Sequence, residues 1–196
     1  MLETILALLL FLFPLAYSPG PGNMFFAANG ARFGFRATLW ANFGYHIATF
    51  IVALAIGLGF AVAMAQFAQM FVALKVVGAV YVLWLAWKML RSDTLKGAET
   101  AQVAGFIDGV ILLLLNPKAY VIIALMFTQF LNGTDGTGAV LLITGIFTLN
   151  NLVAFTLWSA LGDVISQRFR GDTSARRLNL LFSIILASVA IWMLVL

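Results

Sequence analysis

Long hydrophobic runs make up most of the chain, and short segments rich in glycine, proline or charged residues separate them. Each run is close to or above the roughly 20 residues that an α-helix needs to cross the hydrocarbon core of a bilayer. None of them alternates apolar and polar residues as membrane β-strands do. The pattern therefore predicts six helical spans, at about residues 2–31, 37–65, 71–90, 104–131, 138–161 and 178–196.

The composition agrees with a membrane protein and excludes a large extramembrane domain. Of the 196 residues, 63% are hydrophobic and 9% are charged, against about 25% charged in soluble domains. The chain has no cysteine and one histidine, His46. Disulfides and metal sites built from cysteines or several histidines are therefore excluded, and we expect no metal and no cofactor. The net charge of +4 does not indicate nucleic-acid binding, because in membrane proteins the positions of the basic residues matter more.

Most basic residues fall in three predicted loops that share one side of the membrane. These nine are Arg32, Arg36, Lys88, Arg91, Lys96, Arg168, Arg170, Arg176 and Arg177, whereas the other two, Lys75 and Lys118, fall inside spans. The positive-inside rule places the basic loops in the cytoplasm, so both termini are predicted to be periplasmic. The start of the first span contains Glu3 and no basic residue. This is unlike a secretory signal, so we expect the first span to be retained.

The two halves of the chain, 1–95 and 96–196, are predicted to run in opposite directions through the membrane. Each half opens with a span that proline interrupts near its middle, and each second span contains amide side chains, Asn42 in one and Asn150 and Asn151 in the other. We therefore predict a single all-α membrane domain of six transmembrane helices in two inverted three-helix halves. Matching interruptions in inverted halves indicate the midplane substrate site of a secondary transporter.

The first interruption is the run Ser18-Pro19-Gly20-Pro21-Gly22-Asn23. Proline and glycine at this density do not continue a helix. A half-helix from Asn23 to Ala31 would then present its N-terminal N–H groups to the protein interior, where they suit a substrate carboxylate. The alternative is a kink that only shapes the packing.

The second interruption is Asn116-Pro117-Lys118. Its half-helix would offer N–H donors in the same way, with Asn116 as a candidate helix cap. A lysine inside a span is costly unless it is paired or hydrated. Lys118 therefore either adds positive potential near a substrate carboxylate, exchanges protons, or is paired for structural reasons.

The remaining polar groups of the spans supply candidates for substrate contact and for proton coupling. Asn42 and His46 are four residues apart and share one helix face. The amide side chains of the spans, which are Asn42, Asn150 and Asn151, either contact a zwitterion or form hydrogen bonds between helices. His46 is a candidate proton carrier because its ordinary pKa lies near neutrality, although a packing role is the alternative. Asp108, one turn into the fourth span and close to the cytoplasmic face, is the acid best placed to enter the pathway and the preferred candidate, against the alternative of an acid that favours the start of a helix.

Four motifs, in order, resemble the LysE/RhtB family of bacterial amino-acid exporters over essentially the whole chain. They are the Ser-Pro-Gly-Pro run at 18–21, the small basic turn at 30–36, the Lys-x-x-Gly-Ala-x-Tyr pattern at 75–81, and Gly-Phe at 105–106 followed by Asn-Pro-Lys-Ala at 116–119. The chain has Gly44-Tyr45 where many members have Gly-Asp. A mechanism that needs an acid at this position is therefore not expected.

The resemblance implies a bacterial inner-membrane exporter of amino acids or closely related small zwitterions, and not an enzyme. The broken inverted halves agree with secondary transport, for which we expect protons to be the driving ion. No catalytic residue is assigned and no nucleotide-binding Walker motif is present. The alternatives are an exporter of a cation or another small solute and, more distantly, an intramembrane enzyme. The expected partners are the substrate and the bilayer, with no nucleic acid. A homodimer and a monomer fit the sequence equally well.

Overall fold

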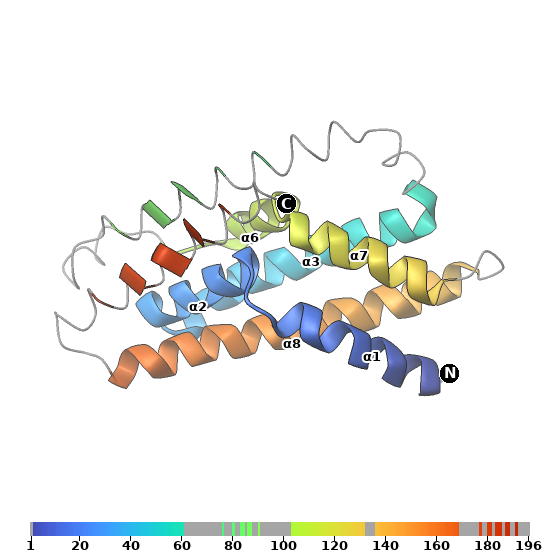
Figure 1. Ribbon diagram of the computed structural model, residues 1–196, viewed down its shortest axis with the longest axis horizontal. Coiled ribbons are helices and arrows are strands. Elements are labelled where there is room, and N and C mark those ends of the chain that lie inside the picture. Colours follow the sequence, from blue (N-terminus) through green and yellow to red (C-terminus); the bar gives the residue numbers. More distant parts are fainter. Residues whose placement is uncertain are drawn as a thin grey trace.

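The computed structural model describes residues 2–60, 103–131 and 136–168, together with single positions between 76 and 90 and between 177 and 191. Every regular element within these described residues is a helix. Figure 1 shows the long helices lying side by side as a bundle, with α8 running along most of its length. The predicted third and sixth spans, and the end of the second, fall largely or wholly outside the described residues, so the six-span arrangement remains a prediction.

The first predicted span is a bent pair of helices. Helix α1 covers Leu2–Tyr17 and α2 covers Pro21–Phe33, and their axes differ by 62°. The predicted interruption is therefore confirmed, but the second helix begins at Pro21, two residues before the expected Asn23. Proline fits the first position of a helix because its fixed φ suits the helix and its missing N–H is not needed there.

The fourth predicted span is bent in the same way. Helix α6 covers Phe106–Leu114 and α7 covers Pro117–Phe130, with 65° between the two parts. Proline is again the first residue of the second helix. Both spans are long and apolar enough to cross a membrane only when their two parts are counted together, as expected for the broken helices of a transporter.

Two further helices are long and apolar enough to span a membrane. A short 3-10 turn, η1 at Phe35–Thr38, leads into α3 at Leu39–Ala55, and the π-helical turn η2 follows at Ile56–Phe60. Helix α8 covers Thr137–Arg168 and continues seven residues beyond the predicted end of the fifth span. The described residues thus contain two unbroken candidate spans, and up to four candidate spans if each bent pair is counted as one.

Two helix pairs lie so close that their backbones touch. Gly30 of α2 faces the carbonyl oxygen of Ser159 in α8, and Gly162 of α8 faces that of Ala27 in α2; an added Cβ would lie 2.1 and 2.0 Å from these oxygens. No side chain fits at either glycine. Small residues at such positions let membrane helices approach closely.

Helices α3 and α6 repeat this reciprocal arrangement. Gly44 of α3 faces the carbonyl oxygen of Phe106, and Gly109 of α6 faces that of Ala41, where an added Cβ would lie 2.0 and 1.9 Å away. In both pairs the carbonyl belongs to the residue three positions before the glycine of the same helix. We call the two contacts, α2 with α8 and α3 with α6, the glycine seams.

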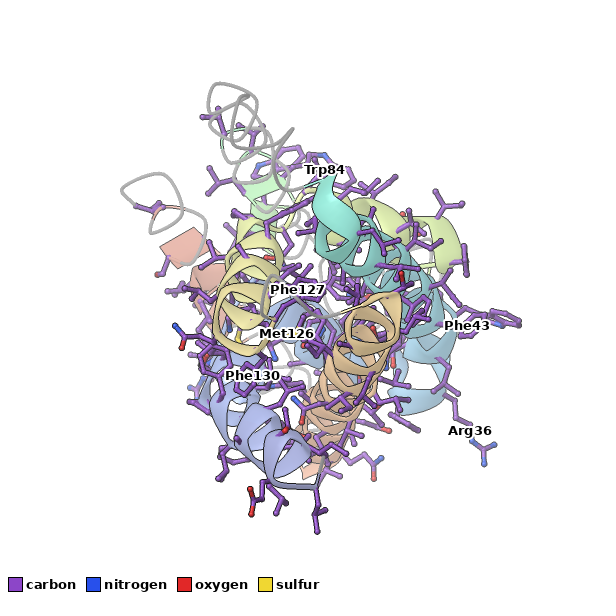
Figure 2. The ribbon with its side chains drawn as sticks, turned by 90° about the vertical axis from the view of Figure 1, so that its right-hand side faces the viewer. Arg36, Phe43, Trp84, Met126, Phe127 and Phe130 are labelled. Carbon is purple, nitrogen blue, oxygen red and sulfur yellow. The ribbon has the colours of Figure 1, made fainter. Side chains whose placement is uncertain are left out.

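The opposite half of the bundle is packed by large side chains. A buried cluster joins α1, α3, α7 and α8, and includes Leu8, Leu12, Ile123, Met126 and Phe147. Figure 2 shows Met126 and Phe127 directed into the bundle, whereas Arg36 and Phe43 point away from it. The glycine seams lie toward the end with Arg32 and Arg36, which we call the basic end. Backbone contacts therefore close the basic end, and interlocking side chains close the other.

Candidate functional site

The two helix breaks meet near the middle of the bundle through Lys118. Its Nζ donates hydrogen bonds to the carbonyl oxygen of Ser18 at 2.8 Å and to Ser18 Oγ at 3.0 Å, with the carbonyl oxygen of Pro19 at 3.4 Å. Lys118 is half-buried. Its ammonium therefore lies at the C-terminal end of α1, where the helix dipole favours a positive charge.

The carbonyl groups of Leu15, Ala16 and Tyr17 at the end of α1 each accept a hydrogen bond from a side chain. Ser18 Oγ donates to Leu15 at 3.2 Å, Asn23 Nδ2 to Ala16 at 2.9 Å, and Trp158 Nε1 to Tyr17 at 3.2 Å. A helix leaves its last four carbonyls without partners inside the helix. Side chains from α2, α7 and α8 thus replace the backbone bonds that the break removes, and Asn23 serves this purpose.

The start of α2 keeps unused N–H donors. The first backbone bond of this helix runs from the Met24 N–H to the Gly20 carbonyl, at 2.9 Å. The Gly22 and Asn23 N–H groups precede it, and no hydrogen bond from either is found among the described residues. They are the free first-turn donors of the helix, so the predicted half-helix does present unpaired N–H groups at its start, and their role in anion binding stays a prediction.

Asn116 occupies the N-cap position of α7, but its side chain does not cap the helix. Its Nδ2 instead donates to the Tyr45 hydroxyl at 2.8 Å. Its Oδ1 is buried and has no hydrogen-bond partner among the described residues. A buried amide oxygen without a donor is costly, so this atom is an acceptor available to a ligand.

A second polar chain crosses from α3 to α8. His46 Nδ1 lies 2.8 Å from the Asn42 carbonyl oxygen, and His46 Nε2 lies 3.4 Å from Asn151 Nδ2. A carbonyl only accepts, so Nδ1 carries the proton and Nε2 accepts from Asn151 when the ring is neutral. Asn42 Nδ2 also donates to Thr156 Oγ1 at 3.1 Å. The predicted shared face of Asn42 and His46 is thereby confirmed, and it faces α8.

Two other predicted residues lie apart from this cluster. Asp108 is exposed at the start of α6, where its Oδ2 accepts a hydrogen bond from the Gly105 N–H at 2.7 Å. This is the contact of an acid that stabilises a helix start. Asn150 is half-buried, and its Nδ2 has no partner among the described residues. It does not line the central cavity described next.

A small cavity lies between the two breaks and α8. About 10 Å³ is open to the centre of a water molecule, roughly the space that one water needs. The described conformation therefore leaves no room for an amino acid without movement of the helices. The lining residues are Leu15, Ala16, Asn23, Tyr45, Asn116, Lys118, Ala119, Ile122, Phe147, Asn151 and Phe155.

Phe155, which the sequence pattern did not single out, packs against the aromatic side of this cavity. Its ring centroid lies 4.7 Å from Tyr45, 5.2 Å from Phe26 and 5.3 Å from His46. A Cβ added to Gly22 would lie 2.6 Å from Phe155 Cζ, so this glycine makes room for the ring. One phenylalanine among 18 offers no signal by which the sequence could single it out.

The arrangement suits the binding of a zwitterion. The Lys118 ammonium and the first-turn N–H groups of α2 are donors for a carboxylate, and Asn116 Oδ1 is an acceptor for an ammonium. Within the described residues no group of three His, Cys, Asp or Glu side chains could hold a metal ion.

Comparison with known proteins gives the same class of function. The family model "LysE type translocator" matches residues 13–196. A Vibrio cholerae protein named "Uncharacterized membrane protein" is 30% identical over 184 residues, which cover 90% of this chain and 89% of that protein. Proteins named "Cysteine/O-acetylserine efflux protein" from Salmonella typhimurium and Escherichia coli K12 are 29% and 28% identical, each with 90% of both chains covered. No solved structure matches.

Proposed function

Because the chain belongs to the LysE type translocator family, we propose that it exports small amino acids by secondary active transport coupled to protons. The family consists of multi-pass membrane transporters, and its members that are similar to this chain include amino-acid efflux proteins. The substrates that we propose are cysteine, O-acetylserine and similar small zwitterions, after the names of those relatives.

The meeting of the two broken spans at Lys118 is the observation that carries this proposal. A substrate carboxylate would bind the Lys118 ammonium in place of the Ser18 and Pro19 carbonyl oxygens that now lie 2.8 and 3.4 Å from Nζ. A charged partner makes a stronger hydrogen bond than a neutral carbonyl. Binding would therefore release the end of α1 from α7. The position of one helix break relative to the other would then depend on whether the site is occupied.

The amide groups would complete the site. Asn116 Oδ1, which has no partner among the described residues, would accept from the substrate ammonium. The Gly22 and Asn23 N–H groups would donate to its carboxylate. Four residues would contribute by setting the backbone shape of the breaks and not by side-chain contact with the substrate, namely Pro19, Gly20, Pro21 and Pro117. Asn42 and Asn150 would act more remotely, since neither lines the cavity.

Proton coupling is assigned to His46. Its ring lies between the Asn42 carbonyl and the Asn151 amide, and Asn151 lines the cavity. If Nε2 gains a proton it becomes a donor, and Asn151 must then present Oδ1 instead of Nδ2. Protonation would thus change the group that Asn151 offers to its surroundings. Asp108 is the second candidate, but its contact with Gly105 supports a role in starting α6.

Reconstitution tests this function. Purified protein in liposomes loaded with labelled cysteine, kept reduced, should release the label faster when the exterior is made acidic than when the pH is equal on both sides. A protonophore should abolish the difference, and protein-free liposomes should show neither effect. Absence of protein-dependent release would contradict export, whereas release that is insensitive to the pH gradient would contradict only the coupling.

A further inference from the structure

A second cavity opens on the outer surface of the bundle, between α3 and α8 near the basic end. Its volume, measured to the centre of a water molecule, is about 560 Å³, against about 10 Å³ for the central cavity. Ligand sites commonly occupy roughly 300–1,000 Å³, so this space can hold a ligand. We call it the outer groove, and its described lining residues are Arg36, Leu39, Trp40, Asn42, Phe43, Leu152 and Thr156.

The wall that α3 gives to the outer groove is aromatic and open to the outside. Trp40 and Phe43 are 67% and 53% exposed, and their ring centroids are 6.4 Å apart. The ring of Phe43 also lies 6.0 Å from that of Phe106 in α6. Ring contacts at these distances are stabilising, so the wall is held in place by α6. An exposed aromatic wall on a membrane protein favours an occupant with a large apolar part.

The basic end of the outer groove carries a positive charge that is available to a ligand. Arg36 is the charged side chain among the described lining residues. It is exposed, and its guanidinium has no hydrogen-bond or ion-pair partner within the described part of the chain. Asp163 contacts the same turn, but its carboxylate accepts from the Phe35 N–H and from Gln167 Nε2, both at 2.9 Å. A guanidinium in this position suits a phosphate, which it binds through paired N–H donors.

The groups along the outer groove follow the order of groups in a phospholipid. Arg36, Trp40 and Phe43 share one face, and Figure 2 shows Arg36 and Phe43 pointing outward on the same side of the bundle. They are separated by roughly 10–12 Å along the helix axis, with the indole, a side chain typical of the membrane interface, between them. On the opposite wall, the Thr156 hydroxyl accepts from Asn42 Nδ2 at 3.1 Å and can donate its own proton to an ester carbonyl.

We propose that the outer groove binds an anionic phospholipid, with the phosphate on Arg36 and an acyl chain along Trp40 and Phe43. Basic pockets between membrane helices bind anionic lipid head groups. A zwitterionic lipid fits less well, because no described lining residue is acidic and could balance its cationic group. A second copy of the chain also fits less well, because a two-fold interface on this face would bring two unbalanced Arg36 side chains together.

Quenching of Trp40 by brominated lipids tests this site. Purified protein is placed in phosphatidylcholine nanodiscs that contain rising fractions of phosphatidylglycerol or phosphatidylcholine with brominated acyl chains. The chain has five tryptophans, so the Trp40 signal is the difference between the wild type and Trp40→Phe. Half-maximal quenching should need an about fivefold lower fraction of the brominated phosphatidylglycerol, the preference that one basic residue near an anionic surface provides. Equal fractions for the two lipids would overturn the proposal.

Two arginine variants separate the outer groove from the general charge of the basic end. Arg36→Gln should abolish the preference and leave quenching by phosphatidylcholine intact. Arg32→Gln is the matched control, because the Arg32 guanidinium lies over the Phe33 ring, 5.0 Å from its centroid, and does not line the groove. It should keep the preference, and circular dichroism checks that both variants are folded. An equal loss in both variants would show a surface-charge effect and overturn the site.

Two further measurements need no arginine variant. Salt at 1 M should remove most of the preference in the wild type, because it shortens the screening length to about 3 Å, and a preference unchanged by salt would contradict a role for charge. A Trp40 signal that neither lipid quenches would mean that protein covers the groove, and would overturn lipid binding there. None of these readouts involves transport, so their failure leaves the proposed function untouched.

Discussion

At the scale of single residues, the polar groups of the spans divide into those that hold the breaks and those that remain available. Asn23 holds the end of α1, while Asn116 keeps a buried oxygen free. The sequence predicted that both would lie at the interruptions, but it could not distinguish their roles. That distinction depends on the Ala16 carbonyl and the Tyr45 hydroxyl, which come from distant positions in the chain.

His46 and Asp108 give a prediction at this scale. His46→Gln removes the titrating ring between Asn42 and Asn151, so the acceleration of export by an acidic exterior should be lost while exchange of labelled for unlabelled substrate continues. Asp108→Asn is the matched control, because Asp108 contacts Gly105 outside the cluster. It should keep the acceleration and lose at most about 1 kcal/mol of stability. If Asp108→Asn lost the acceleration and His46→Gln kept it, the coupling group would lie at the start of α6.

At the scale of helices, the two glycines of the first break have different neighbours. A Cβ on Gly22 would lie 2.6 Å from the Phe155 ring, whereas one on Gly20 would lie 2.8 Å from Cδ of the flexible Lys118 side chain. Gly22→Ala should therefore reduce transport far more than Gly20→Ala, with a stability loss of about 1–3 kcal/mol from overpacking. Transport rates and thermal unfolding of both variants check this. Equal effects would mean that the break tolerates side chains on either side.

The glycine seams give a second prediction for the helices. Gly30→Ala and Gly109→Ala should each destabilise the protein by at least the roughly 1–3 kcal/mol that overpacking typically costs. The reason is that the new Cβ meets a backbone carbonyl that cannot move aside. Gly145→Ala in α8 is the control, since nothing lies within 4 Å of its added Cβ, and it should be neutral or slightly stabilising. Thermal unfolding in detergent measures all three. Seam variants as stable as Gly145→Ala would show that the helices can separate without loss.

The helix breaks were predictable, whereas the helices that meet at the glycine seams were not. Proline and glycine interrupt a helix through local backbone chemistry, so the positions of both bends could be read from the sequence. The glycines of the seams depend on which helices become neighbours, and α2 with α8 and α3 with α6 are pairs that are distant in sequence. Phe155 was unpredictable for the same reason: its ring contacts come from two distant helices, α2 and α3.

At the scale of the whole molecule, the distribution of basic residues predicts the orientation. Cysteine introduced at Gly136, between α7 and α8, should react with a membrane-impermeant thiol reagent in intact cells, whereas cysteine at Ser92 should react only after the membrane is permeabilised. The chain has no native cysteine, so the background is clean. Labelling in the reverse pattern would overturn the predicted orientation, with both termini in the periplasm.

The central claim is that the substrate binds between the two helix breaks at Lys118. Equilibrium binding of labelled cysteine to the purified protein tests it most directly. Lys118→Met should weaken binding by at least about tenfold, since a hydrogen bond to a charged group contributes about 1.5–3 kcal/mol, while Gly145→Ala should bind like the wild type. If a folded Lys118→Met protein binds cysteine with unchanged affinity, the substrate site lies elsewhere and the account is wrong.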